Sequence, residues 1–389
     1  MKITKLKTVI VNAKMRNWVL VKIETDQPGL YGWGEASLEM KTRAVAGALA
    51  DFEPLLIGED PTRIEHLYQK LYREPFFRAG VIGLSAISGI EQACWDIFGK
   101  SANLPVYKLL GGAVRERVRM YTHLGGGEMH AVYETFDAAP LIDRAHAVVA
   151  KGYTALKVVC VPRSEPLMGA ATTRKFARTI EQLRLALGDG VDIMIDLHGR
   201  TSPAMAIQYI NAIADYNPYF CEEPVPSENV KALAEVRKSV RVPIATGERL
   251  VTRHEFREIF EQQACHVIQP DLCHCGGLLE ARKIAAMAEV YYMGVAPHNP
   301  LGPVANAVAL HFGLATPNFL IQEDMLADVP WRFEVVQHSL KTEAGYWLKP
   351  EAAGLGIEVD EAAAAQHPFQ QEINPGSTAR AADGAVLDF

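Results

Sequence analysis

The sequence predicts an α/β protein built on a (β/α)8-type (TIM) barrel, with a second, α+β domain as a cap. Two observations predict the barrel. From about residue 118, short apolar runs alternate with amphipathic helical stretches, which is typical of a parallel sheet covered by helices. Polar residues end six of these runs at intervals of 23 to 27 residues, so each interval advances one strand–helix unit.

The amino-terminal region has a different pattern, in which strands come first and helices follow. A run of strands followed by a run of helices indicates an α+β unit. We expect residues 1–115 to form this capping domain, and the tail, 330–389, to pack on it as its last part. The expected strands are 2–11, 18–25 and 30–36, and the expected helices are 42–56, 61–73 and 82–100.

Residues 116–329 supply the barrel. The eight strand candidates are VRMYTH, ALKVV, DIMID, PYFCEE, VPIATGE, HVIQPD, MGVAPH and NFLIQE. The carboxyl ends of barrel strands meet at one face, where such barrels place their active sites. The polar residues that end the last six strands should therefore converge: Asp196, Glu222, Glu248, Asp271, His298 and Glu323.

Composition excludes several classes of protein. The net charge of −7 argues against a nucleic-acid partner, which would need a basic face, and gives no reason to expect binding to an anionic membrane. The chain contains no apolar run near the ~20 residues that a membrane-spanning helix needs. The first residues alternate like a strand and lack the features of a signal peptide. We therefore expect a cytoplasmic protein.

The cysteines do not suggest a disulfide framework. Cys160, Cys221 and Cys265 lie in or beside apolar runs and are expected to be buried thiols. Cys273, His274 and Cys275 could form a metal site, but no second pair stands at zinc-like spacing. A turn between a strand and a helix is the favoured interpretation of this segment.

Three of the convergent acids predict a metal site. Asp196, Glu222 and Glu248 would lie on consecutive strands, where three ionised carboxylates repel one another unless a cation sits between them. Ligands that are all oxygen favour Mg²⁺ over zinc. The alternative is that each carboxylate pairs with its own lysine or arginine.

Two histidines predict proton transfer. His298 and Asp271 end adjacent strands ~4.8 Å apart, so the carboxylate can fix the ring tautomer and make His298 a general base. His198 follows Asp196 by two residues, and residues i and i+2 of a strand point the same way, so its side chain should project over the same pocket. One imidazole on each side of a reactive carbon suits proton removal by one and protonation of a leaving group by the other. The alternative for His298 is a structural hydrogen bond.

The chain resembles the enolase superfamily, and within it the mandelate-racemase-like branch, over essentially its whole length. The segments that carry the resemblance include GLYGWGEASLE, GLSAISGIEQACWDIFGK, DLHGR, EEPV, GERL, IQPDLCHCGG, APHNPLGPVA and LIQED. The nearest likeness is to sugar-acid dehydratases such as those that act on D-galactonate. The resemblance implies one Mg²⁺ held by Asp196, Glu222 and Glu248, and a C2 proton removed by His298 with Asp271.

The resemblance also implies roles for other residues. His198 would protonate the departing 3-hydroxyl, and Glu323 would hydrogen-bond the carboxylate that becomes an enediolate. The product would be a 2-keto-3-deoxy sugar acid. Segments around Arg16–Trp18 and Phe76–Arg78 resemble loops that close over a substrate. The residues expected to bind substrate are Arg16, Trp18, Phe77, Arg78, His123, Lys157 and Gln269.

Departures from the family pattern leave the substrate open. Many relatives end their second barrel strand in Lys-x-Lys. Here the residue two positions after Lys157 is Val159, which removes a second base and favours dehydration over racemisation. An aldonate like D-galactonate is the expected substrate. An aldarate dehydratase, an epimerase or cycloisomerase, and a non-catalytic sugar-acid-binding protein are the alternatives. A homo-oligomer, dimer or octamer, is expected by resemblance alone.

Overall fold

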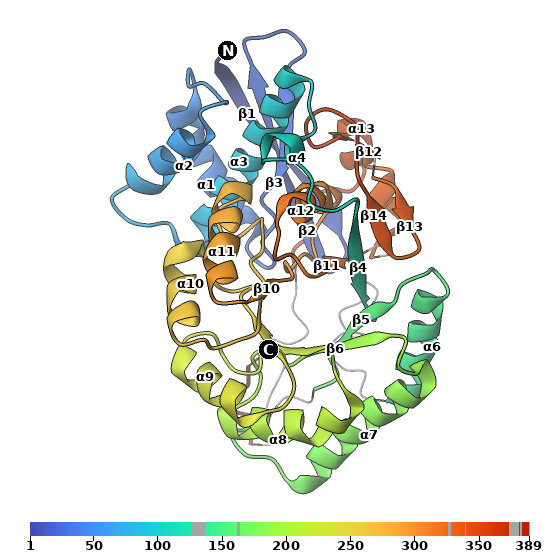
Figure 1. The fold of residues 1–389 in the computed structure, drawn as a ribbon. Helices are drawn as coiled ribbons and strands as arrows, with labels where there is room; N and C mark the ends of the chain where they lie inside the picture. The colour runs from blue at the N-terminus through green and yellow to red at the C-terminus, as the bar shows by residue number, and fades with distance from the viewer. Residues whose placement is uncertain are drawn as a thin grey trace.

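A three-stranded antiparallel sheet with helices packed on it forms the amino-terminal part of the computed structural model (Figure 1). The structure describes residues 1–125, 137–161, 164–325, 328–338, 340–372, 381 and 383–388. The strands β1 (Ile3–Ala13), β2 (Arg16–Thr25) and β3 (Tyr31–Glu35) pair in chain order. The helices are α1 (Thr42–Leu56), α2 (Ile64–Arg73), α3 (Gly80–Ala102) and the short α4 (Val106–Leu109). The predicted α+β pattern of this region is confirmed.

Helix α3 is the central element of this part because it packs on β3 and is buried along most of its length. Small residues allow the close approach: a side chain at Gly34 of β3 would collide with the backbone oxygen of Gly89 in α3. Burial on several sides explains why α3 also carries polar residues that point away from solvent. Four of those polar residues contact residues 272–279 of the barrel region: Ser85, Ser88, Glu91 and Gln92.

Eight parallel strands form the predicted barrel. They are β4 (Arg117–His123), β5 (Ala155–Val158), β6 (Asp192–Asp196), β7 (Phe220–Glu222), β8 (Ile244–Thr246), β9 (Val267–Ile268), β10 (Gly294–Val295) and β11 (Gln322–Asp324). Neighbours from β4 to β10 pair in chain order, and β11 pairs with β4. Two backbone hydrogen bonds close the remaining gap: Val295 N–H donates to Asn318 O at 3.0 Å, and Leu320 N–H donates to Val295 O at 2.8 Å.

Side chains from all eight strands or their edges fill the inside of the barrel. This inner cluster packs large against small residues beneath the strand ends, so the barrel has a solid floor rather than a pore. Its members are Tyr121, Ala155, Met194, Phe220, Ala245, Val267, Ala296 and Ile321.

Helices cover the outside of the barrel. They are α6 (Ala138–Val149), α7 (Ala170–Leu187), α8 (Pro203–Ile213) with the 3-10 turn η1 (Ala214–Tyr216), α9 (Val230–Ser239), α10 (Thr252–Glu261), α11 (Leu278–Val290) and α12 (Pro303–Ala315). After β11 the described chain continues into the 3-10 helix η2 (Pro330–Phe333) instead of an eighth α-helix. Seven helices therefore cover the eight strands in the described ranges.

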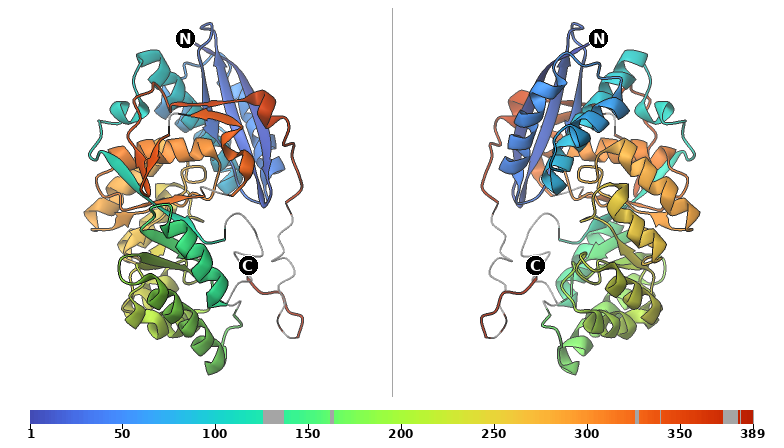
Figure 2. Two further views of the ribbon diagram at one scale, coloured as in Figure 1. Left: turned by 90° about the vertical axis from the view of Figure 1, so that its right-hand side faces the viewer. Right: turned by 90° about the vertical axis from the view of Figure 1, so that its left-hand side faces the viewer.

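The carboxy-terminal tail divides between the two parts of the molecule (Figure 2). β12 (Val336–His338) pairs with β15 (Ile357–Val359), and Glu361 at the start of α13 (Glu361–Ala364) forms ion pairs with Lys7 and Lys22 of the amino-terminal sheet. The tail also reaches the barrel. β14 (Tyr346–Leu348), which pairs with β13 (Thr342–Glu343), also pairs with β4 and so extends the barrel sheet.

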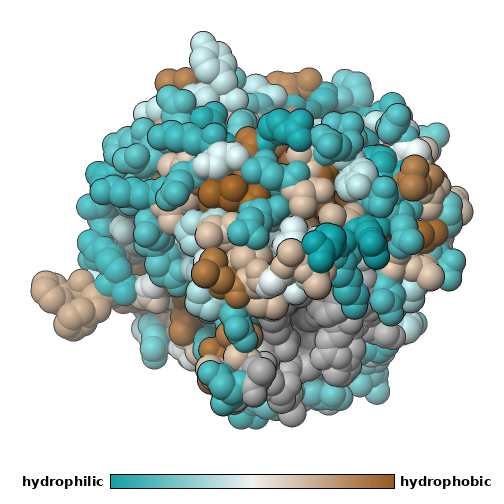
Figure 3. Space-filling model, turned by 90° about the horizontal axis from the view of Figure 1, so that it is seen from below, coloured by the Kyte–Doolittle hydropathy of each residue, from teal (hydrophilic) through white to brown (hydrophobic). Residues whose placement is uncertain are grey.

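The surface seen from below in Figure 3 is largely hydrophilic, and its apolar residues are scattered rather than gathered in one patch. In the part of the chain that the structure describes, we find no helix with the length and apolar character to span a bilayer.

Candidate active site

Three carboxylates converge at the carboxyl ends of β6, β7 and β8. Asp196 and Glu222 are the last residues of their strands and stand directly opposite each other in the register. Glu248 lies two residues beyond β8. One oxygen from each of the three side chains lies within 4.8 Å of the other two. The convergence that the spacing predicted is therefore present.

Fewer positive charges than negative charges lie within this cluster of carboxylates. Burial raises the pKa of Asp196 to about 7, that of Glu222 to about 7 and that of Glu248 to about 8. Lys157 of β5 is shared: its Nζ lies 2.9 Å from Glu222 Oε1 and 3.9 Å from Asp196 Oδ2. The alternative, in which each carboxylate pairs with its own lysine or arginine, is therefore only partly realised, because Glu222 and Asp196 share Lys157. A hard divalent ion fits this donor set, because the ligand atoms are all oxygens with an excess of negative charge.

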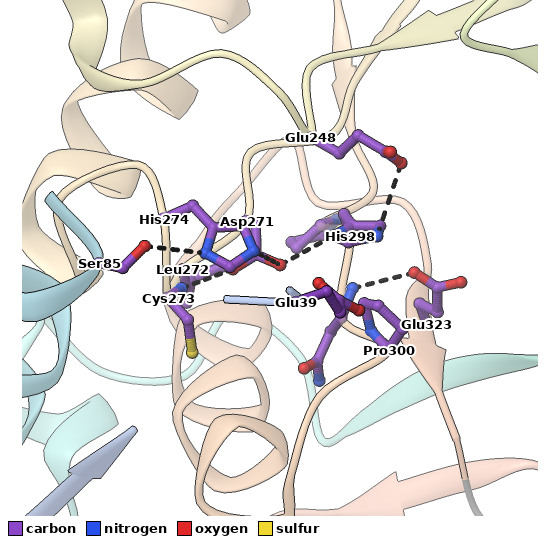
Figure 4. Close-up of polar contacts among 12 residues, drawn as sticks. Glu39, Ser85, Glu248, Asp271, Leu272, Cys273, His274, His298, Pro300 and Glu323 are labelled. Carbon is purple, nitrogen blue, oxygen red and sulfur yellow. Dashed lines mark hydrogen bonds and ion pairs between the residues drawn. The ribbon is translucent and has the colours of Figure 1, made fainter. Parts of the chain in front are cut away.

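An Asp–His pair lies beside Glu248, one of these acids (Figure 4). His298 Nδ1 lies 2.8 Å from Asp271 Oδ2, and since a carboxylate only accepts, Nδ1 is the donor. The other ring nitrogen, Nε2, lies 3.5 Å from Glu248 Oε2. Burial alone would lower the pKa of His298, but the charge of Glu248 and the hydrogen bond to Asp271 raise it well above its usual value. The ring therefore turns one fixed nitrogen toward the carboxylate cluster.

His198 lies beside the cluster for a different reason than the sequence suggested. β6 ends at Asp196, and His198 has a φ of 56°, so strand alternation does not extend to it. Its backbone N–H donates to Asp196 Oδ1 at 2.7 Å, which holds the turn against the carboxylate. The side chain is half-buried. Its role as an acid stays a prediction.

Glu323 and His123 complete the polar lining around Lys157. Glu323 Oε1 lies 2.7 Å from Lys157 Nζ. Burial would raise the pKa of Glu323, but Lys157 and His298 lower it to about 2, so this carboxylate is ionised. His123 Nδ1 accepts from Gly125 N–H at 2.9 Å, and burial followed by the charge of Lys157 lowers its pKa to about 3. His123 is therefore neutral, with its proton on Nε2.

Two more buried groups belong to this region. The amide of Gln269, one residue after β9, is buried beside Glu222, whose pKa its hydrogen bond lowers, and it has no further partner among the described residues. Sequence reasoning missed Tyr121, whose ring lies 5.6 Å from Lys157 Nζ and whose hydroxyl is buried without a partner among the same residues. It precedes His123 by two residues in β4, so strand alternation could have indicated it.

The expected capping residues are placed differently from one another. Arg16 is buried, forms an ion pair with Glu39 at 2.9 Å and donates to the carbonyl of Pro300, in the loop after His298. Trp18 is fully buried in the hydrophobic core, with the Arg332 guanidinium 5.0 Å from its ring, and its contact with a substrate stays a prediction.

The Phe76–Arg78 segment does not close over the site in this arrangement. Phe77 is 82% exposed, and Arg78 donates to the carbonyl of Arg73 at the end of α2 and to that of Pro75 in its own loop. A closing movement of this segment stays a prediction.

The cysteine-rich segment is the turn that was favoured. Cys273, His274 and Cys275 lie between β9 and α11, and the six cysteines are all free and buried, as expected for Cys160, Cys221 and Cys265.

Comparison with known proteins agrees with this geometry. Residues 2–111 match the family model of the mandelate racemase/muconate lactonizing enzyme N-terminal domain, and residues 141–363 match that of the enolase C-terminal domain-like family. The chain is 37% identical over 395 residues to a D-galactonate dehydratase from Ralstonia nicotianae, covering 100% of both proteins.

Two solved structures are similar to this chain over its whole length. An enolase from Pantoea ananatis with bound D-gluconate and Mg is 31% identical, with a TM-score of 0.88 and coverage of 100% of this chain and 99% of that one. An enolase from Agrobacterium radiobacter with bound Na and L-malate is 34% identical over 100% of both chains, with a TM-score of 0.90.

The capped barrel, its three acids on successive strands and the opposing Asp–His pair define an enzyme of the enolase superfamily. Within that superfamily, the chain belongs to the mandelate racemase/muconate lactonizing enzyme family.

Proposed function

We propose that the protein is a Mg²⁺-dependent dehydratase of a sugar acid, with an aldonate such as D-galactonate as its substrate. The observation that carries the proposal is the Asp271–His298 pair, which turns the second imidazole nitrogen toward the cluster of Asp196, Glu222 and Glu248. The names of the relatives, one a D-galactonate dehydratase and another an enolase with bound D-gluconate and Mg, support the substrate class.

His298 removes the C2 proton in this proposal. Its Nδ1–H is committed to Asp271, so Nε2 is the nitrogen that accepts the proton. Mg²⁺ bound by Asp196, Glu222 and Glu248 would weaken the effect of the Glu248 charge on His298. The pKa of His298 would then fall toward its usual value, at which the ring can act as a base. The ion would also offset the charge that develops on the substrate carboxylate. A positioned base contributes ~10²- to 10⁴-fold in rate, or roughly 3–5.5 kcal/mol.

His198 acts on the opposite face of the substrate. It gives a proton to the 3-hydroxyl as the C3–O bond breaks, water leaves, and the resulting enol tautomerises to a 2-keto-3-deoxy acid. Val159 is buried and apolar, so the second barrel strand offers no second base. This favours elimination over racemisation.

Lys157, Gln269 and the neutral His123 bind the substrate. Each offers N–H donors to carboxylate or hydroxyl oxygens. The role expected of Glu323, a hydrogen bond to the enediolate, requires a protonated carboxyl. Lys157 now keeps it ionised, so this role requires Lys157 to turn from Glu323 to the substrate carboxylate.

Incubation in D₂O with Mg²⁺ and a stereochemically complete panel of aldonates and aldarates tests the proposal. We expect an aldonate to yield a keto acid that reacts with semicarbazide, and EDTA to abolish its formation. A keto acid from an aldarate alone would correct the substrate, and deuterium exchange or inversion at C2 without keto acid would indicate an epimerase. No turnover of any acid would favour a binding protein.

A further inference from the structure

One polar face of α3, in the capping region, holds the chain that follows Asp271. The stretch GLSAISGIEQ supplies four side chains at helical spacing, and each bonds to a group within residues 272–279. Ser88 Oγ accepts from Gly276 N–H at 3.1 Å, and Gln92 Nε2 donates to the carbonyl of Leu272 at 2.9 Å. The Glu91 carboxylate accepts the first two N–H groups of α11, and Ser85 reaches His274.

His274 lies between this helix and the catalytic pair (Figure 4). It is only 4% exposed; its Nδ1 lies 3.3 Å from Ser85 Oγ, and its Nε2 lies 3.5 Å from Asp271 Oδ2. The same Asp271 oxygen accepts from His298 Nδ1, while Oδ1 accepts from Cys273 N–H at 2.6 Å. Both oxygens of Asp271 are thus held, and His274 is the group on the side away from His298.

Ser85 allows two hydrogen-bond arrangements at His274, and both leave a proton on Nε2. Ser85 has one hydroxyl proton and two acceptors in reach, the carbonyl of Val81 at 2.8 Å and His274 Nδ1. If Ser85 donates to His274, the neutral ring carries its proton on Nε2. If Ser85 donates to Val81, it accepts from Nδ1–H, and a favourable contact with Asp271 then needs the doubly protonated ring. In both arrangements Nε2–H points at Asp271.

We propose that His274 is a positioning residue for the general base, held in place by Ser85 of the capping helix. It fixes Asp271 Oδ2, and through it the ring of His298, so that Nε2 of His298 keeps facing the carboxylate cluster. Small errors in the placement of a catalytic group cost large factors in rate. This inference rests on the proposed role of His298 as a base. A metal ion between Asp271, His274 and His298 would fit the spacing, but it would have to displace the proton of the 2.8 Å hydrogen bond.

Two variants of His274 separate positioning from packing. His274→Phe keeps an aromatic ring and removes the donor, whereas His274→Gln keeps an N–H donor near the place of Nε2. We expect His274→Phe in the Mg²⁺-saturated enzyme to lower kcat at least about tenfold with KM within about threefold, and His274→Gln to recover most of the loss. Ser85→Ala should give a smaller change in the same direction.

A second readout needs no substrate. In protein labelled with ¹⁵N-histidine, the proton on His298 Nδ1 should give a downfield resonance that shifts or broadens in His274→Phe and returns in His274→Gln. His311, which is buried and bonds to Tyr107 N–H and the carbonyl of Leu355, supplies the control: His311→Phe should lower Tm and change neither readout. An unchanged resonance and kcat in His274→Phe, or equal losses in both His274 variants, would overturn the proposal. If wild type dehydrates no sugar acid, the proposed function fails while the resonance still decides the role of His274.

Discussion

Glu248→Gln should stabilise the metal-free protein and remove its response to Mg²⁺. The side chain is only 14% exposed, and burial raises its pKa to about 8 from the ordinary 4.5. The folded protein therefore binds a proton more tightly than the unfolded chain. Stability from this group is fully present below pH 4.5 and is lost as pH rises toward 8. Glutamine has a similar shape and no charge, so it escapes this loss.

The magnitude follows from the shift. At pH 7 the group lies about 2.5 pH units above its unfolded pKa, and each unit is worth about 1.36 kcal/mol, so the gain is roughly 3 kcal/mol; the attraction to His298 is already contained in the shifted pKa. Unfolding entropy of ~2.1 cal/mol/K per residue makes this an increase of about 4 °C in Tm. Mg²⁺ at 100 times its Kd should stabilise wild type by about 2.7 kcal/mol, and the variant by much less.

Thermal unfolding in EDTA and in Mg²⁺, at pH 5 and pH 7, measures both effects. The advantage of Glu248→Gln over wild type in EDTA should be larger at pH 7 than at pH 5. Glu228, which is exposed just before α9, supplies the matched control, and Glu228→Gln should change neither value. The reasoning is refuted if Glu248→Gln is no more stable than wild type in EDTA at pH 7, or if Mg²⁺ still raises its Tm as in wild type.

Three further variants test the proton transfers. His298→Asn should lose both deuterium exchange at C2 and elimination, since it removes the base; exchange that survives would indicate another base. Asp271→Asn should lower kcat by roughly 10²- to 10⁴-fold, because an amide can stabilise the wrong tautomer of His298, and an unchanged rate would argue against the pair. His198→Asn should keep the Mg²⁺-dependent rise in Tm and the exchange but fail to eliminate water, and normal keto-acid formation would refute its role as acid.

The barrel could be predicted because its cause is periodic. Each strand–helix unit repeats an apolar run, a helix and a polar residue at the strand end, so Asp196 and Glu222 could be placed from spacing alone. Glu248, Asp271 and His298 were also found, although each lies two or three residues beyond its strand. The repeat determines where each strand ends. The two or three residues beyond the strand are too few to move the side chain away from the mouth of the barrel.

Other features depend on contacts between distant parts of the chain, which no local pattern reports. The turn at His198 follows from the hydrogen bond of its N–H to Asp196, not from the strand pattern. The pairing of β14 with β4 depends on how the tail crosses the barrel. Trp18 lies against Arg332, which comes more than three hundred residues later in the chain. The role of the polar face of α3 can be recognised only from its contacts with the segment after Asp271.

A crystal structure of the protein with Mg²⁺ and a sugar acid tests the central claim most directly. The account predicts one ion bound by an oxygen from each of Asp196, Glu222 and Glu248 at about 2.1 Å, with His298 Nε2 facing C2 of the acid. Carboxylates that turn away from one another, with no ion between them while the acid is bound, would contradict it.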